Sequence, residues 1–216
     1  MPRIYDLGEY TEKLESVSLI VGDGLCSNIY VTGKENAVIV DTGVGNSTNS
    51  VWPQLEELGV APVNVKGVVL THAHHDHAMG AFIILERADP KVFVHKLDTA
   101  HIASRFGGNL VKVEEGDLIQ TELEPFQVVW TPGHTEGSIC LYGEEEKILF
   151  SGDTVFPDGS FGRCDGESGS IQAIIESLRK LTELDVDVML PGHGPPVLEN
   201  ASEHIKQSYI NASKYG

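Results

Sequence analysis

Cysteine is scarce in this sequence, and its three residues, Cys26, Cys140 and Cys164, lack the even number and regular spacing of a disulfide framework. A chain of 216 residues can bury enough apolar surface to fold without disulfides. No apolar run approaches the length of a membrane span. The first residues also lack the basic region and apolar stretch of a signal peptide. We therefore expect a protein of the reducing cytoplasm.

Basic residues are also few, with 15 Lys and Arg against 32 Asp and Glu, which gives a net charge of −17 with His neutral. A nucleic-acid-binding surface and a surface that docks on anionic membranes both need clustered positive charge. We therefore expect neither partner and interpret the acidic residues as a solvated surface. Because no linker or low-complexity segment divides the chain, residues 1–216 are predicted to form a single domain.

Short apolar segments alternate with turns along the whole chain. In the first third, the patterns predict three strands joined as an antiparallel meander, then a helix with Pro53 in its first turn. Strands and helices alternate after that, which indicates βαβ units. Strands are predicted over residues 14–21, 27–31, 37–40, 65–70, 92–94, 128–130, 139–142, 148–150 and 186–190, with a polar turn and strand region over 114–121. Helices are predicted over residues 50–58, 78–87, 96–105, 171–181 and 199–214.

Strong metal ligands crowd the segment that follows the strand predicted over residues 65–70. They are His72, His74, Asp76 and His77, while His75 occupies a spacer position and is expected to point away. A strand end, a tight loop and a helix start form an arrangement suited to holding metal. One closed tetrahedral site does not need so many ligands, so the segment indicates a set divided between two ions.

The same design recurs after three later strands. In each case a Gly or Pro turns the backbone and a potential ligand follows: His134, Asp153 and His193. Because strand ends on one edge of a sheet lie side by side, we expect these loops to converge. Five His and two Asp supply nitrogen and oxygen ligands that suit Zn, Fe or Mn. Seven ligands exceed the four of a structural zinc site, so the sequence predicts a catalytic centre, in which two ions sharing a carboxylate lie ~3.5–4 Å apart.

Asp41 ends an apolar strand just before Thr42 and Gly43. A carboxylate at such a position can brace a metal-ligating histidine through a hydrogen bond. It can equally well cap a turn. The histidines outside the loops, His95, His101 and His204, are not predicted to belong to the site.

Four sequence motifs carry a family resemblance: His-Ala-His-His-Asp-His, Pro-Gly-His-Thr-Glu-Gly-Ser, Ser-Gly-Asp-Thr and Pro-Gly-His-Gly. In this order they resemble the motif series of the metallo-β-lactamase superfamily. The resemblance implies the α/β class, as an αββα sandwich with the metal site at one edge. It implies one ion held by His72, His74 and His134, and a second held by Asp76, His77 and His193. Asp153 is then implied to bridge both ions.

Within that superfamily, the stretch from Phe161 to Gly166 resembles the Gly-Arg-x-Asp loop of small glyoxalase-II-like proteins. The implied activity is hydrolysis of thioesters such as hydroxyacyl-thiol conjugates, with two divalent ions, Zn first and Fe or Mn as alternatives. Asp76 is the expected catalytic residue, since it can orient the nucleophile and take its proton. Arg163 is expected to contact the thiol carrier, or else to form a salt bridge with Asp165 or Asp158.

Other members of the superfamily fit less well. Most true β-lactamases of this type have Cys at the position of Asp153 or lack a bridging carboxylate, nucleases usually have a basic face, and lactone hydrolases often place a Tyr where Phe156 and Phe161 stand. The alternative is a persulfide dioxygenase with one iron ion, which resembles this chain at His72, His134 and Asp153 and in the Gly-Arg-x-Asp loop. A non-enzymatic metal-binding or scaffold protein is a third class. The sequence leaves open the thiol carrier, the native metal and the oligomeric state.

Overall fold

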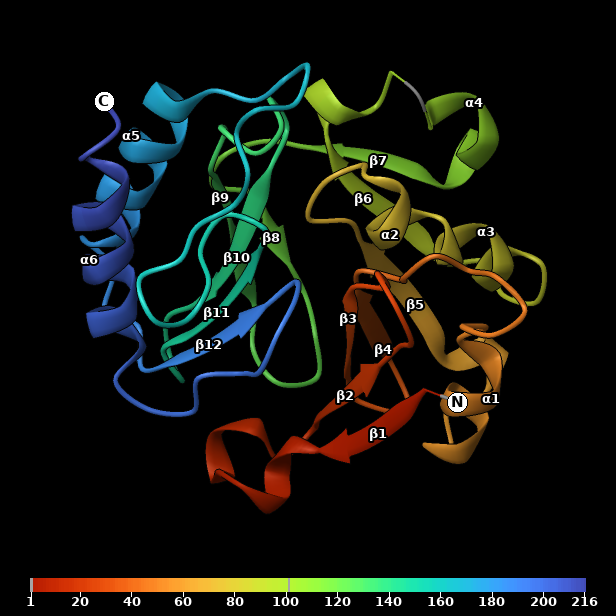
Figure 1. Ribbon diagram of the computed structural model, residues 1–216. Coiled ribbons are helices and arrows are strands. Elements are labelled where there is room, and N and C mark those ends of the chain that lie inside the picture. The colour runs from red at the N-terminus through yellow and green to blue at the C-terminus, as the bar shows by residue number, and fades with distance from the viewer. Residues whose placement is uncertain (1, 101) are drawn as a thin grey trace.

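The computed structural model describes residues 2–100 and 102–216, in which two β-sheets lie face to face between two layers of helices (Figure 1). The larger sheet contains, in spatial order, β1 (Arg3–Asp6), β2 (Val17–Val21), β3 (Asn28–Thr32), β4 (Ala37–Val40), β5 (Val65–Val69), β6 (Lys91–His95) and β7 (Leu110–Val113). The smaller sheet contains β12 (Val188–Pro191), β11 (Ile148–Gly152), β10 (Ile139–Gly143), β9 (Phe126–Trp130) and β8 (Leu118–Ile119).

The larger sheet changes its strand direction at β4. Strands β1 to β4 pair antiparallel, which confirms the predicted meander and adds one strand at its edge. Strands β4 to β7 pair parallel, which confirms the predicted βαβ units. The crossovers contain α1 (Trp52–Glu57), α2 (His75–Ala78), α3 (Gly80–Leu85) and α4 (Ala103–Phe106). Because parallel strands end at one edge, β4 and β5 deliver their following loops to the same place.

Alternation along the strands divides the core into three layers. Val38 and Val40 of β4 pack between the two sheets, whereas Ile39 packs under the helices outside the larger sheet. On the far side, Cys140 and Leu149 pack against α5 (Ile171–Leu181) and α6 (Ala201–Ala212), which cover the smaller sheet (Figure 1). Strands β3 and β4 are buried along their whole length because apolar layers cover both of their faces. The αββα sandwich is thereby confirmed.

Two predicted helices are interrupted. The helix expected over residues 78–87 is split into α2 and α3, and α2 already begins at His75, inside the ligand-rich segment. The helix expected over residues 96–105 is wrong: a 3-10 turn, η4 (Lys96–Asp98), is followed by the short α4. Asp98 accepts three hydrogen bonds from loops outside its own segment, and these contacts fix the chain in the turn. His101 lies outside the described residues.

Smaller differences affect the ends and the length of elements. The strand expected from residue 14 begins at Val17, because Leu14 belongs to a preceding 3-10 turn, η2 (Glu12–Leu14), and points into the core. Strands β1 and β7, four residues each, are not among the predicted strands. Among the described residues, none of the helices has both the length and the apolar character that crossing a membrane requires.

Gly80 offers a test of how tightly the loop after β4 packs on α3. A Cβ at this position would collide with the backbone carbonyl oxygen of Thr42. We predict that Gly80→Ala lowers the free energy of unfolding by about 1–3 kcal/mol, even though Ala is the better helix former. Chemical denaturation measures the change.

The matched control is Gly108→Ala, since a Cβ at Gly108 meets no atom within 4 Å. This variant should be neutral or slightly stabilised, by up to about 1 kcal/mol. Equal stability of the two variants would contradict the close contact at Gly80.

Candidate metal centre

Five strand ends meet at one edge of the sandwich. In the smaller sheet, β9 and β11 are both antiparallel to β10, and β12 is parallel to β11, so all three end at the same edge. They are followed by His134, Asp153 and His193. A hydrogen bond of 2.9 Å from Ile139 N to Thr71 O joins this edge to the loop after β5. The structure therefore brings all seven predicted ligands together, from the edges of two sheets and not of one.

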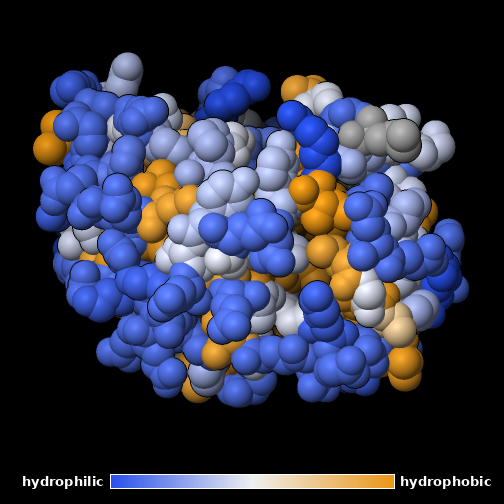
Figure 2. Space-filling model, turned by 90° about the horizontal axis from the view of Figure 1, so that it is seen from below, coloured by the Kyte–Doolittle hydropathy of each residue, from blue (hydrophilic) through white to orange (hydrophobic). Residues whose placement is uncertain are grey.

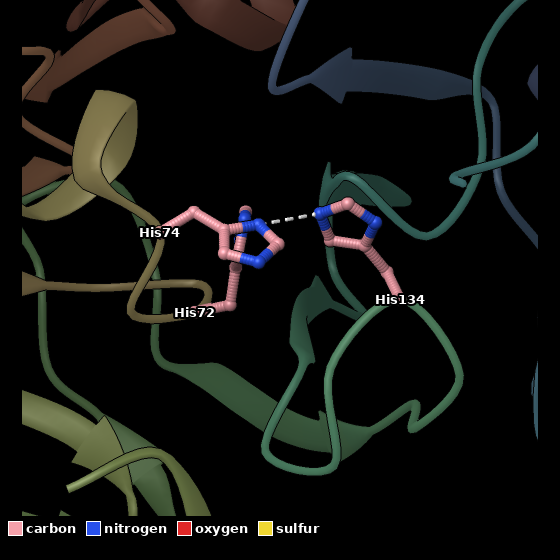
Figure 3. Close-up of side chains that lie close together, drawn as sticks. All are labelled: His72, His74 and His134. Carbon is pink, nitrogen blue, oxygen red and sulfur yellow. Dashed lines mark hydrogen bonds between the residues drawn. The ribbon is translucent and has the colours of Figure 1, made fainter. Parts of the chain in front are cut away.

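The first group consists of His72, His74 and His134 (Figure 3). One ring nitrogen from each residue lies within 4.8 Å of those of the other two. Their ring centroids are 4.6–4.7 Å apart and the ring planes are nearly perpendicular. His74 Nδ1 lies 2.8 Å from His134 Nε2. Two ring nitrogens this close share either a proton or a cation. Because a third ring nitrogen, from His72, lies within 4.8 Å of both, the group has the donor set of a cation site.

The second group consists of Asp76, His77 and His193. His193 Nε2 lies 3.1 Å from Asp76 Oδ2 and 3.2 Å from His77 Nε2. Asp76 and His77 both come from the start of α2, and the loop after β12 supplies His193. This group is buried on the His77 side and opens to solvent at the other two residues, whose side chains are 30% and 35% exposed.

Asp153 lies between the two groups. Its Oδ1 is 3.4 Å from His77 Nε2, in the second group. Its Oδ2 is 3.6 Å from His134 Nε2 in the first group and 3.7 Å from His193 Nε2. One carboxylate thus reaches both sets of ring nitrogens, which is the position that a bridging ligand requires.

Hydrogen bonds at Nδ1 orient three of the rings. His77 Nδ1 donates to Asp41 Oδ2 at 2.8 Å, and His134 Nδ1 donates to the backbone oxygen of Arg163 at 2.7 Å. Thr71 Oγ1 gives its proton to Asp41 Oδ2 at 2.8 Å, so it accepts from His72 Nδ1 at 3.1 Å. With Nδ1 engaged in this way, Nε2 of each ring is the atom directed to the centre. This is the usual tautomer arrangement of metal-ligating histidines.

Two polar atoms at the centre favour a bound cation. His72 Nε2 and Asp153 Oδ1 are buried and have no hydrogen-bond partner among the described residues. An unpaired buried polar group costs about 1–3 kcal/mol, and a metal ion removes that cost. Gly192 leaves the space open, because a Cβ there would collide with Asp153 Oδ1 and crowd His77. The residues present therefore fit divalent ions with nitrogen and oxygen ligands, and none of the three cysteines belongs to either group.

The electrostatics favour the coordinating forms of His72 and Asp76, but not that of His77, in the metal-free protein. Burial and the neighbouring histidines hold the pKa of His72 well below its usual value, so its ring stays neutral. Burial by itself raises the pKa of Asp76, but a hydrogen bond from His193 and the charge of His77 lower it to about 2. Burial acts to lower the pKa of His77, but Asp41 and Asp153 raise it well above the usual value. In the metal-free protein, the ring of His77 is therefore protonated and positively charged.

The other predicted residues have distinct positions. The buried carboxylate of Asp41 contacts His77, so the bracing interpretation describes its contacts better than a simple turn cap. The guanidinium of Arg163 is 84% exposed and pairs with Asp165, one of the two salt bridges considered from the sequence. Its role in substrate binding stays a prediction. His75 is exposed and belongs to neither group.

Two contacts that support the candidate ligands were not predicted from the sequence. One is the backbone oxygen of Arg163 on His134. The other is the carboxylate of Asp98, which accepts from Ala73 N, Thr135 Oγ1 and Gly137 N at 2.9 Å each and so joins the loops that hold the first group. An acidic residue beside a predicted strand end was the only available signal for Asp98. A backbone carbonyl leaves no signal in a sequence.

A cavity of about 510 Å³ opens beside His74 and His134. Its other walls include three acidic side chains, Asp98, Glu136 and Glu167. This volume is within the range of small-molecule sites, so a substrate can approach the first group from this side.

The geometry agrees with what comparisons with known proteins show. The family model described as "Metallo-beta-lactamase superfamily" matches residues 21–193. The chain belongs to the metallo-β-lactamase superfamily. Most members of this superfamily are hydrolases, and the ligand-rich segment and the three later ligand loops all lie within the matched region.

Three similar proteins illustrate the range of the superfamily. The chain is 30% identical to the probable metallo-hydrolase MJ0888 of Methanocaldococcus jannaschii, over 80% of this chain and 90% of that protein. It is 29% identical to the hydroxyacylglutathione hydrolase GloC of Haemophilus influenzae, over 78% of this chain and 84% of that protein. The crystal structure of TTHA1623 in a di-iron-bound form has a TM-score of 0.67 at 30% identity, covering 82% of this chain and 93% of that one.

The hydrogen bond between Asp41 and His77 leads to a prediction about metal affinity. Asp41→Asn replaces a charged acceptor by an amide that meets three donors, so the ring of His77 loses its anchor. We expect metal affinity to fall about 10–100-fold, as measured by competition with a chromophoric chelator. Asp187→Asn is the control, since Asp187 accepts from Lys13 and Asn200 away from the centre. Unchanged affinity in Asp41→Asn would contradict the bracing role.

The raised pKa of His77 leads to a second prediction. Because His77 is protonated in the metal-free protein at neutral pH, an ion must displace that proton, and affinity should rise with pH. For one proton the slope is about tenfold per pH unit, and chelator competition at several pH values measures it. The slope should be smaller in Asp41→Asn, where the neighbouring negative charge is removed. A pH-independent affinity in the wild-type protein would contradict this account.

Proposed function

We propose that this protein is a metal-dependent hydrolase of thioesters, acting on small thiol conjugates of the hydroxyacyl-thiol type at a centre with two divalent ions. The observation that carries the proposal is the position of Asp153, which reaches both ligand groups with its two oxygens while Oδ1 has no hydrogen-bond partner among the described residues. The similarity to a hydroxyacylglutathione hydrolase supports the choice of substrate class. We take residues 1–216 to act as one domain.

The proposed ligand sets follow the two groups. His72, His74 and His134 would hold one ion, Asp76, His77 and His193 would hold the other, and Asp153 would bridge them. Bound divalent ions supply a water with a pKa lowered to about 7 and positive charge that stabilises a carbonyl oxygen as it becomes negative. Zinc fits this donor set, and so do iron and manganese.

The side chains around the centre have separate tasks in this proposal. Asp76 is partly exposed and ionised, with its pKa at about 2, so it can accept a hydrogen bond from the attacking water and orient it. The water adds to the thioester carbonyl carbon, the carbon–sulfur bond breaks, and the products are a carboxylate and a thiol. The cavity next to His74 and His134 would hold the thiol carrier. Arg163, which does not line this cavity, stays the proposed contact of the carrier in the neighbouring loop.

A second candidate function is oxidation of a persulfide by O₂ at a single iron ion. The observation that favours it is the set of His72, His134 and Asp153. The two rings are 4.7 Å apart, and Asp153 Oδ2 lies 3.6 Å from His134 Nε2. Two histidines and one carboxylate form the ligand set of many iron-dependent oxygenases. Metal analysis combined with a thioester assay and an oxygen electrode separates the two candidates. About two ions per chain with thioester hydrolysis supports the first, and one iron with O₂ uptake on a persulfide overturns it.

The bridging carboxylate leads to the central prediction. Asp153→Ala should reduce the metal content from about two ions per chain to one or fewer, and should lower the rate of thioester hydrolysis by a factor of at least 10². Elemental analysis and a thiol-release assay measure the two quantities. Asp158→Ala is the control, because the side chain of Asp158 is 91% exposed. Full activity with full metal content in Asp153→Ala would sink the proposal.

A further inference from the structure

A second cavity, of about 410 Å³, is lined in part by Gly194, which directly follows His193 of the candidate centre. Strands β1 and β2 form one wall, and the loop after β12 forms the other. On this side of the molecule, apolar atoms gather between hydrophilic patches (Figure 2). The proposed hydrolysis assigns no part of the substrate to this cavity, although its volume is that of a small-molecule site.

Strand register makes the first wall apolar. Tyr5 of β1 lies opposite Leu19 of β2, and Arg3 lies opposite Val21. Residues two apart in a strand point to the same face, so these four side chains share one surface. Among the residues that line the cavity, Arg3 at the exposed edge is the only charged one. The wall therefore offers an apolar surface with a single positive charge at its rim.

The second wall is held in place before any ligand arrives. Asn28 Nδ2 donates to Pro191 O at 2.9 Å and to Gly194 O at 2.8 Å. Farther along the loop, Val197 pairs with Met189 through two backbone hydrogen bonds of 2.8 and 2.9 Å. Between these two anchors the backbone contains two prolines, which fix its course. A cavity preformed in this way binds a ligand with little cost of ordering its own walls.

The cavity adjoins the candidate metal centre through the loop after β12. Gly194, which lines it, directly follows His193, and buried Asn28 holds the backbone on both sides of that histidine. The cavity beside His74 and His134 contains three acidic side chains, whereas this one contains none. A thioester at the centre has two arms, a polar thiol carrier and an acyl group. One cavity adjoins the first ligand group and the other adjoins His193, and they differ in charge as the two arms differ in polarity.

We propose that the cavity between β1, β2 and the loop after β12 binds the acyl group of the substrate, and that this group is an apolar chain of medium length. The proposal rests on the proposed thioester hydrolysis, and it assigns the substrate a longer apolar acyl chain in place of a short hydroxyacyl group. Each buried methylene contributes about fourfold to binding, which is the ~0.8 kcal/mol of its transfer from water. Efficiency should therefore rise with chain length until the cavity is full.

The test compares acetyl, butanoyl, hexanoyl and octanoyl thioesters of one thiol. With the wild-type protein, kcat/KM should rise about fourfold per methylene over at least part of the series. Val21→Phe fills the cavity from its half-buried wall position. This variant should lose at least tenfold in kcat/KM for the octanoyl thioester and keep the acetyl value within about threefold. Val63→Phe is the matched control, since Val63 is 76% exposed and does not line this cavity.

A binding measurement separates this proposal from the proposed function. Octanamide, an uncharged probe, should bind the purified protein in calorimetric titration with a negative change in heat capacity, and acetamide should not. Val21→Phe should abolish octanamide binding. If no thioester is hydrolysed while octanamide binds in this manner, the proposed function falls and the apolar cavity stands.

Three results would overturn the inference itself. One is thioester hydrolysis at equal kcat/KM for all chain lengths, together with no octanamide binding. Another is loss of octanamide binding and octanoyl selectivity in Val63→Phe as well as in Val21→Phe. The third is a change of molecular mass in solution for Val21→Phe without a change in selectivity, which would identify the surface as an interface between copies of the chain.

Discussion

The carboxylate of Asp41 is the contact on which the candidate centre depends. It is 2% exposed and accepts three hydrogen bonds, from Thr71 N at 2.9 Å, Thr71 Oγ1 at 2.8 Å and His77 Nδ1 at 2.8 Å. These bonds join the end of β4 to the loop after β5 and to the start of α2. Asp41 adopts a φ of 57°, a conformation that Asp tolerates better than most residues. Each buried donor left without this acceptor would cost about 1–3 kcal/mol, so the geometry of the loop is tied to one side chain.

The same physical requirement is met in three different ways around the centre. A histidine can direct Nε2 to an ion only if Nδ1 has an acceptor that fixes the ring. For His77 the acceptor is a carboxylate, for His72 it is the hydroxyl of Thr71, and for His134 it is a backbone carbonyl. The third case gives the loop around Arg163 a structural role. The backbone of Arg163 fixes the candidate ligand His134, while the side chain of Arg163 extends into solvent.

The sequence predicted what alternation and residue type can encode. Buried strands such as β4 and β5 stand out as apolar runs, and side chains that can hold a metal appear directly after them. Strands β1 and β7 are four residues long, and charged residues flank or interrupt their apolar residues, so no continuous apolar run marks them. The turn at Asp98 depends on contacts with residues 25 to 39 positions away, and these overrule the helical pattern of residues 96–105.

The assembly of the candidate centre from two sheets could not be predicted from local sequence patterns either. It depends on β9, β11 and β12 sharing a direction, and on backbone hydrogen bonds between the sheet edges, such as Ile139 N to Thr71 O and Asn28 N to Gly192 O. The resemblance to a known superfamily supplied the sandwich, whereas the two cavities next to the centre follow from side chains far apart in the chain. The cavity lined by Tyr5, Leu19 and Pro196 is an example.

The overall charge of −17 acts differently on the two arms of a substrate. Two divalent ions would add +4 against −2 from Asp76 and Asp153, so the centre itself attracts anions, but the cavity beside His74 adds Asp98, Glu136 and Glu167. A strongly anionic thiol carrier is therefore opposed by the wall it would touch and by the surface it would cross. An uncharged apolar acyl group meets neither obstacle, because burial of apolar area is insensitive to net charge. The distribution of charge thus disfavours anionic carriers, while the apolar cavity next to His193 provides the binding energy that the acidic surface does not oppose.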